Sequence, residues 1–136
     1  HLRTRRQRQM CIRDRTTYLI TGGLTCYCMN DAILVLQTTL PGTLNEALVG
    51  DWCNEMIRLG LAACLKVNKV DSIYRWNGET VSNPEWAIQV KTSLASKSNL
   101  VEWLKENHPN EVPEIICWQA SAEQEYGLWI GELDPE

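Results

Sequence analysis

The chain has 136 residues, a formal net charge of −4, and 44% hydrophobic against 22% charged residues. This length suits one domain with its own core, and the longest apolar runs are far shorter than the ~20 residues of a membrane helix. Residues 1–30 sum to a charge of +5 and residues 31–136 to −9. Because such an acidic body repels phosphate, we expect neither a nucleic-acid nor a membrane partner.

Residues 1–30 are expected to form a leader outside the fold. They hold six arginines without a regular apolar pattern, which predicts disorder, and residues 1–15 resemble translated adapter sequence rather than native protein. The cysteines beyond the leader, Cys53, Cys64 and Cys117, lie in apolar patterns. With no secretory signal recognised, they predict reduced thiols in a cytoplasmic protein. The organised domain is expected over residues 31–136.

The first predicted elements are a buried strand and a helix. Residues 32–40, AILVLQTTL, are almost continuously apolar at first, which is typical of a central strand. Thr43 and Glu46 match a capping box, and Gly60 supplies a left-handed stop, so a helix is predicted over residues 44–59. Its apolar residues recur at helical spacing: Leu44, Ala47, Leu48, Trp52, Met56 and Leu59.

A β-hairpin is predicted next. Residues 64–76 have β character, and Asn77-Gly78 is a strong hairpin signal because both turn positions require positive φ. The return strand is expected over about 85–92. Pro84 is expected near its beginning, where no ladder hydrogen bond is needed.

A second helix, a fourth strand and a terminal helix complete the prediction. Ser96 or Ser98 caps the second helix, and His108-Pro109 ends it because proline disfavours helical geometry in the preceding residue. EIICWQA, residues 114–120, is the fourth strand, and Ser121 caps the terminal helix. The side chains of this last helix expected to face inward are Tyr126, Trp129, Ile130 and Leu133.

The order β-α-β-β-α-β plus a short C-terminal helix predicts an α+β fold of the ferredoxin-like type. Two helices cover one face of such a sheet. The strands carry more apolar side chains than one helical layer needs, among them Trp76, Trp86 and Trp118. A bare apolar face ordinarily finds a partner, so we expect an oligomer.

Four motifs in this order give the chain a resemblance to a known family. They are Ala62-Ala63-Cys64, Ser72 to Gly78, Glu85 through Lys91-Thr92, and His108-Pro109 through Pro113-Glu114. From about Ile33 to Leu133 the chain resembles the CutA family of divalent-cation tolerance proteins. The resemblance implies a ferredoxin-like fold in a tight homotrimer, with hairpin strands pairing between subunits. It also implies a cytoplasmic protein of metal-ion response, with copper binding in some members. Gln37 and Asn107 stand where members often have cysteine and histidine.

His108 is the central candidate for a metal site. Its position also suits a helix-terminal histidine that meets the negative end of the helix dipole, and a catalytic base is the third alternative. As a ligand for weakly bound copper or another divalent cation, its imidazole would act with Glu111, Glu114 and the thiol of Cys64. Cys64 has an apolar setting that equally suits core packing.

Tyr74, Trp76, Glu85 and Lys91 are candidates for a cleft between subunits. Glu85 and Lys91 share one face of the return strand but lie ~20 Å apart along it, so they cannot pair within one subunit. They can pair across a trimer or line a pocket for a small anion. From the resemblance we expect a non-enzymatic homotrimer that binds a divalent metal weakly. The alternatives are a PII-like trimeric sensor of a small anionic ligand and a structural scaffold.

Overall fold

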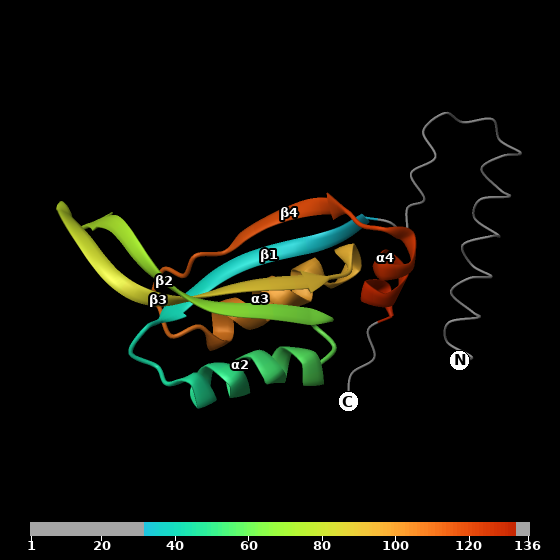
Figure 1. Cartoon of the computed structure of the whole chain (residues 1–136), viewed down its shortest axis with the longest axis horizontal. Coiled ribbons are helices and arrows are strands. Elements are labelled where there is room, and N and C mark those ends of the chain that lie inside the picture. Colours follow the sequence, from blue (N-terminus) through green and yellow to red (C-terminus); the bar gives the residue numbers. More distant parts are fainter. Residues whose placement is uncertain (1–31, 133–136) are drawn as a thin grey trace, which may run out of the picture.

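The structure is a computed structural model that describes residues 32–132 (Figure 1). The predicted leader over residues 1–30 and the inward-facing position predicted for Leu133 lie outside the described residues. The elements follow the predicted order: β1 (Ala32–Pro41), α2 (Glu46–Arg58), β2 (Cys64–Trp76), β3 (Glu79–Thr92), the 3₁₀ turn η2 (Leu94–Ser96), α3 (Lys97–Asn107), β4 (Ile116–Ser121) and α4 (Gln124–Gly131).

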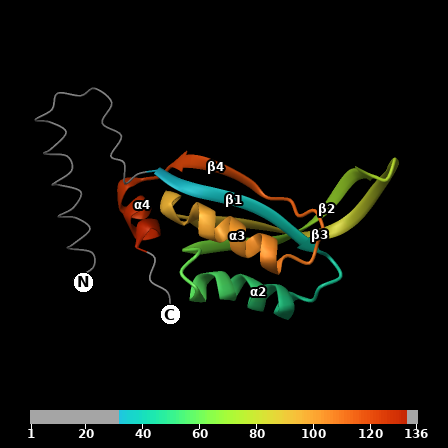
Figure 2. The same cartoon turned by 180° about the vertical axis from the view of Figure 1, so that it is seen from behind.

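The four strands form one sheet in the order β2-β3-β1-β4, with every neighbouring pair antiparallel. This order and the two crossover helices confirm the predicted ferredoxin-like α+β fold. Figures 1 and 2 show α2 and α3 together on one face of the sheet. The central strand β1 lies between β3 and β4, which explains why its sequence is almost continuously apolar.

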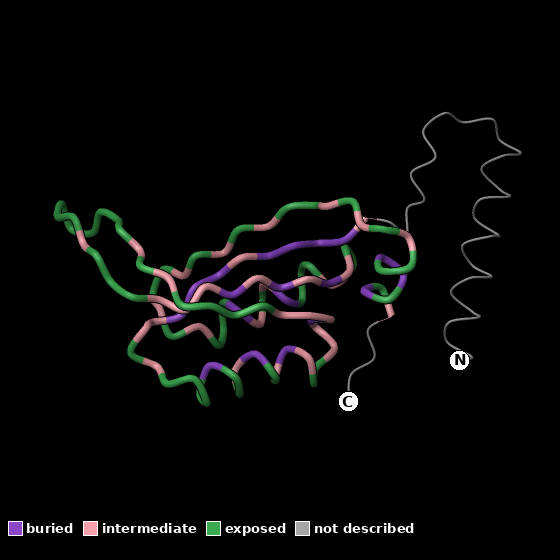
Figure 3. The backbone as a smooth tube through the Cα atoms, in the orientation of Figure 1, coloured by how far each residue is buried: buried purple, intermediate pink, exposed green. Residues whose placement is uncertain are grey.

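The main core lies between the sheet and these two helices. Alternate residues of β1 point toward the helices, and Leu36 and Leu40 are fully buried there; Figure 3 shows β1 among the most buried strands. The buried members of this core are Leu36, Leu40, Val49, Cys53, Met56, Ala62, Ile88, Val90, Leu100 and Leu104. Burial raises the pKa of the Cys53 thiol to about 11, which keeps it protonated and inert as a packing residue.

The opposite face of the sheet is covered at one end only. Ile33 and Val35 pack there against Ile130 of α4. Farther along the same face, Ile116 and Trp118 remain 49% and 40% exposed. One helical layer therefore leaves apolar sheet surface uncovered in the single chain, as the sequence predicts.

The β2–β3 hairpin extends well beyond the rest of the sheet. Pairing of β1 with β3 ends at Pro41↔Glu85, whereas β2 and β3 continue to pair as far as Trp76↔Glu79. Residues 71–84 thus form a two-stranded arm that projects from the body in Figure 1. At its tip Asn77 and Gly78 have φ values of 49° and 78°, which confirms the predicted turn.

The return strand is longer than predicted, because β3 begins at Glu79 rather than near residue 85. Pro84 lies inside it, opposite Asp71. The carbonyl of Pro84 accepts a hydrogen bond from the Gly42 N–H at 3.1 Å, so the ring nitrogen faces the side where β1 has already turned away. The absent N–H costs no ladder bond there, which is why the strand can pass through a proline.

Helix α2 begins later than predicted and buries a different stripe. Asn45, not Thr43, caps it, since the Asn45 side chain accepts from the Leu48 N–H at 2.9 Å. The buried residues are Val49, Cys53 and Met56. The predicted stripe is confirmed only in part: Met56 is buried and Leu44 and Trp52 pack against the core, whereas Leu48 is 53% exposed and Leu59 is 37% exposed. Gly60 has φ 72° and ends the helix as predicted.

The other helices confirm the predicted positions but not all of the contacts. Ser96 precedes α3, although its hydroxyl bonds Ser93 rather than the helix amides. Glu123 caps α4 by accepting from the Tyr126 N–H at 3.1 Å; Ser121 cannot, because it still belongs to β4. Tyr126 and Trp129 are 37% and 39% exposed, so their predicted inward orientation is wrong. The buried residues of α4 are Gly127, Leu128 and Ile130.

Candidate functional site

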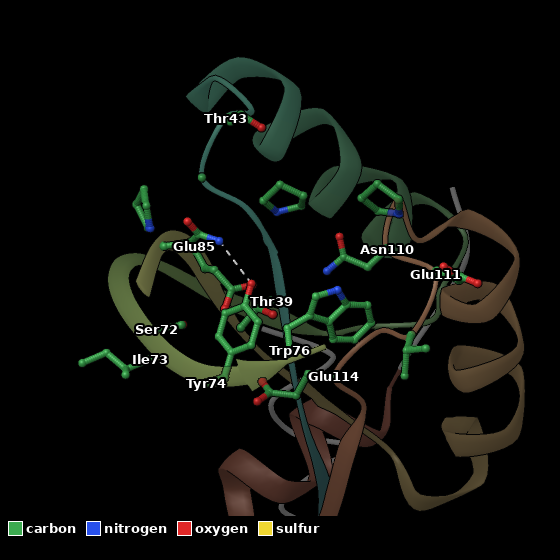
Figure 4. A pocket seen from close by; sticks show the side chains of 16 residues that line it. Thr39, Thr43, Ser72, Ile73, Tyr74, Trp76, Glu85, Asn110, Glu111 and Glu114 are labelled. Atoms are coloured by element: carbon green, nitrogen blue, oxygen red, sulfur yellow. Dashed lines mark hydrogen bonds between the residues drawn. The ribbon is translucent and has the colours of Figure 1, made fainter. Parts of the chain in front are cut away.

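A groove of about 860 Å³ lies where the arm meets the body. We call it the arm groove. Its walls come from the end of β1, from the arm strands β2 and β3, and from the loop between α3 and β4, residues 108–115 (Figure 4). The end of β1, the β2–β3 hairpin and the loop before β4, which are distant from one another in the sequence, thus meet at one place.

Three carboxylates lie in the arm groove, those of Glu85, Glu111 and Glu114. Glu85 comes from β3, and the other two come from the loop. No lysine or arginine is among the described residues that line the groove. Negative charge that is not neutralised locally attracts cations and repels small anions.

Two aromatic side chains form another part of the lining. Tyr74 and Trp76 are alternate residues of β2, so they project from the same face of the arm, and they are 40% and 51% exposed. The Asn83 side-chain amide donates to the Tyr74 hydroxyl at 3.2 Å, which holds the ring in place (Figure 4). The apolar residues Ile73 and Val112 also line the groove, and both are largely exposed.

His108 is the first residue of the loop that carries two of the carboxylates. Its Nε2 is 2.9 Å from the Thr39 carbonyl oxygen and 3.1 Å from Thr38 Oγ1. Its Nδ1 accepts from the backbone N–H of Asn110 at 3.0 Å. Since a backbone N–H can only donate, the neutral ring carries its proton on Nε2 and donates it to Thr39. Both ring nitrogens therefore have a partner within the chain.

The surroundings of His108 favour the neutral ring. Burial lowers the pKa of His108 below its usual range, and the Thr39 carbonyl and the negative charge of Glu85 oppose this effect only in part. Trp52 of α2 meets the imidazole edge-on, with ring centroids 5.8 Å apart. His108 has extended backbone angles directly after α3, which confirms that the helix ends at this residue.

The structure brings together five of the eight predicted site residues. Tyr74, Trp76 and Glu85 of the predicted cleft line the arm groove with the predicted ligands Glu111 and Glu114. His108 begins this loop and accepts a hydrogen bond from the Asn110 N–H, although it does not line the groove.

Cys64 and Lys91 lie elsewhere. They are paired with one another in the register of β2 and β3, six residue pairs from Glu85. Cys64 packs beside the cluster of Ile33 and Val35 under α4. Lys91 Nζ donates to the Tyr126 hydroxyl at 3.4 Å, near the face of its ring. Glu85 and Lys91 do share one face of β3, as predicted, but they belong to different surroundings.

Sequence reasoning missed several polar residues of the groove. Thr39, Ser72, Asn83 and Asn110 also line it. The alternation Ser72, Tyr74, Trp76 on one strand was a signal for Ser72, because alternate residues share a face. Over residues 32–132, no group of three or more His, Cys, Asp and Glu side chains is arranged to hold a metal ion. The carboxylates of one chain are therefore too dispersed to enclose an ion alone.

The fold and the groove define a class of small α+β proteins, in which a ferredoxin-like sheet carries a long projecting hairpin. Residues 35–133 match the family described as CutA1 divalent ion tolerance protein, and the chain belongs to this family.

Related sequences agree with this assignment. The divalent-cation tolerance protein CutA of Thermus thermophilus is 34% identical over 106 residues, which cover 76% of this chain and 97% of the relative. The protein CutA homolog of Xenopus laevis is 31% identical over 94 residues; the match spans 68% of this chain and 62% of that protein.

Solved structures match the fold closely. The Thermus thermophilus structure aligns with a TM-score of 0.67 at 33% identity, covering 74% of this chain and 97% of that one. CutA1 from Oryza sativa aligns with the same TM-score at 26% identity, covering 75% and 93%. Within residues 32–132, no helix has the length and apolar character needed to span a membrane.

Proposed function

We propose that this chain is a homotrimeric divalent-cation tolerance protein that binds a divalent cation weakly in the cytoplasm and acts as a binding protein rather than an enzyme. The observation that carries the proposal is the negative charge of the arm groove: Glu85, Glu111 and Glu114 are among its lining residues, and no lysine or arginine is among those described. Carboxylate oxygens are suitable ligands for divalent cations, and exposed sites of this kind bind weakly.

The proposed ligands are Glu111 and Glu114 together with Glu85, which the sequence assigns to the cleft. Cys64 lies at the other end of the sheet and His108 is occupied by hydrogen bonds, so neither reaches this group within one chain. Copper is the metal that the family resemblance suggests. A set of oxygen ligands alone favours harder cations, so the test includes both kinds.

The homotrimer is supported by the surface that one chain leaves exposed. Ile73 and Trp76 of the arm are 73% and 51% exposed, and Ile116 and Trp118 of the open sheet face are 49% and 40% exposed. Burying this surface between copies removes apolar area from water. Three copies are the number that the family resemblance implies.

The alternative of an anion sensor has less support in the single chain, because Lys91 lies away from the three carboxylates. A scaffold role is compatible with the exposed arm, and it would be favoured if the titration detected no metal binding. The cytoplasmic location is supported by Cys53, Cys64 and Cys117, which are free cysteines.

The test is calorimetric titration of the full chain with Cu²⁺ and with Mn²⁺. The double variant Glu111→Gln, Glu114→Gln is expected to lose most of the binding, since it removes two charges without changing side-chain size. The matched control is Glu102→Gln, Glu106→Gln, which neutralises two exposed carboxylates on α3 that do not line the groove. Equal binding by the two double variants would contradict the site. Light scattering at micromolar concentration should give the mass of three chains; a monomer would contradict the assembly.

A further inference from the structure

We infer that His108 is a positioning residue, a brace that fixes the loop over residues 108–115 against the free edge of β1. By holding this loop it sets Glu111 in the arm groove without binding the cation itself. The inference rests on the proposed function only for what the groove binds; the brace itself rests on contacts within the chain.

The first contact lies on an edge of β1 that no strand covers. Pairing between β1 and β4 ends at Gln37↔Ile116, yet β1 continues to Pro41. His108 Nε2 reaches the Thr39 carbonyl at 2.9 Å just beyond this point, with the Thr38 hydroxyl at 3.1 Å. The imidazole therefore supplies a hydrogen-bond donor where the neighbouring strand no longer does, and a buried carbonyl without a donor would be costly.

The second contact lies on the loop side. The Asn110 N–H donates to His108 Nδ1 at 3.0 Å, and Asn110 and Glu111 both line the arm groove. One aromatic ring thus joins the end of β1 to the start of the groove wall. Because the ring is planar and rigid, the two hydrogen bonds fix the loop in both distance and direction.

The third contact comes from α2 and encloses the ring. Trp52 meets the imidazole edge-on at 5.8 Å and donates from its Nε1 to the Asn107 carbonyl at 3.0 Å, which secures the last residue of α3. The ring is thereby held between α2, β1 and the loop. A metal ion could reach a ring nitrogen only by breaking the bond to Thr39 or the bond to Asn110.

The decisive experiment is NMR of the full chain with ¹⁵N-labelled imidazole nitrogens. His1→Ala serves as the background because it removes the only other histidine. We expect a protonated Nε2 and an unprotonated Nδ1 in His108 at neutral pH, and we expect both nitrogen signals to stay in place when Zn²⁺ is added. A proton on Nδ1, or ring-nitrogen shifts that follow Zn²⁺ occupancy, would overturn the inference.

Substitutions test the brace by a separate route. His108→Asn retains an acceptor near the Nδ1 position, whereas His108→Gln retains a donor near the Nε2 position and His108→Ala retains neither. Hydrogen exchange of the Asn110 amide should accelerate about tenfold in the Gln and Ala variants, the loss expected for one hydrogen bond, and should stay near wild type in the Asn variant. Equal exchange in all three variants would also overturn the inference.

The outcome separates the brace from the proposed function. Zn²⁺ affinity should fall about tenfold in His108→Ala, the loss expected for the one hydrogen bond between the Asn110 N–H and the His108 ring. It should not change in Lys105→Ala, an exposed position on α3, the helix that ends just before His108. If wild-type protein binds none of Cu²⁺, Mn²⁺ and Zn²⁺, the proposed function fails, while the tautomer and the amide exchange still decide the brace. If Zn²⁺ binds equally to wild type and His108→Ala, the brace fails as a positioning device and the proposed function stands.

Discussion

The two faces of the sheet differ in how far the helices of the same chain cover them. The face toward α2 and α3 is closed, and Leu36, Ile88 and Val90 have no exposed surface there. The other face has cover from α4 at one end and exposes Ile116 and Trp118, and the arm beyond it exposes Ile73 and Trp76. One face is buried within the chain, and the other leaves apolar surface exposed that the proposed homotrimer would cover. The arm groove lies where these two parts of the molecule meet.

This contrast separates folding from function. A closed core contributes free energy in the isolated chain, whereas an exposed apolar surface contributes only when a partner covers it. The groove draws Thr39 from β1, next to the core, and Tyr74 and Trp76 from the exposed arm. Its shape should therefore respond both to subunit stability and to assembly.

The largest expected effect is on the closed face. Leu36→Ala removes a fully buried side chain and should lower the free energy of unfolding by about 2–5 kcal/mol, since it leaves a cavity in the main core. Ile116→Ala on the open face is the matched control, because this side chain is 49% exposed. Denaturant unfolding measures both. An equal loss for the two variants at low protein concentration would show that the two faces do not differ in the way described.

The next effect is on assembly. The double variant Ile73→Ser, Trp76→Ser removes the most exposed apolar groups of the arm and should weaken the trimer at least tenfold, because it removes area that partner copies would bury. Light scattering over a dilution series measures the shift. Leu48→Ser is the control, being 53% exposed on α2 away from the arm. A trimer that resists the arm variant as well as the control variant would place the interface elsewhere.

Local patterns predicted those elements whose position depends mainly on neighbouring residues. The Asn77-Gly78 turn, the end of α3 at His108 and the buried strand β1 are confirmed, because each follows from backbone preference or a long apolar run. The predicted cap of α2 was wrong because Thr43 and Asn45 are both good capping residues. They lie two positions apart, and the sequence alone does not show at which of them the helix begins. The arm length was missed because an exposed strand has no burial pattern that marks its end.

The site was predictable in membership but not in arrangement. The family motifs contain Glu85, Glu114 and both aromatics of the groove, and Glu111 was selected as an acidic residue close to His108. The confirmed two-residue turn at Asn77-Gly78 fixes the β2–β3 register, so it already pairs Cys64 with Lys91, six residue pairs from Glu85; the predicted ligand set did not take this consequence of the turn into account. The two hydrogen bonds that occupy His108 depend on where β4 stops pairing with β1, a property of three segments together.

A smaller effect is expected from pH at the junction of the two regions. The pKa of His108 is lowered in the folded chain by burial, so the unfolded chain binds this proton more readily. Stability from this group is therefore present above the unfolded pKa of 6.5 and is lost as pH falls below it toward the folded pKa. Denaturant midpoints between pH 5 and 7.5 should fall with acidity in wild type. His108→Gln should remove that part of the slope, and an unchanged slope would contradict the assignment.

The smallest expected effect concerns a hydroxyl on the closed face. Thr92 has no exposed surface, and its Oγ1 has no hydrogen-bond partner among the described residues. Thr92→Val replaces it with an apolar group of similar shape and should raise the free energy of unfolding by about 1 kcal/mol, since an unsatisfied buried donor is removed. Thr38→Val is the matched control, because the equally buried Thr38 hydroxyl lies 3.1 Å from His108 Nε2 and should lose about as much. Unfolding in urea measures both changes. Destabilisation by Thr92→Val would mean that this hydroxyl is satisfied in the folded protein.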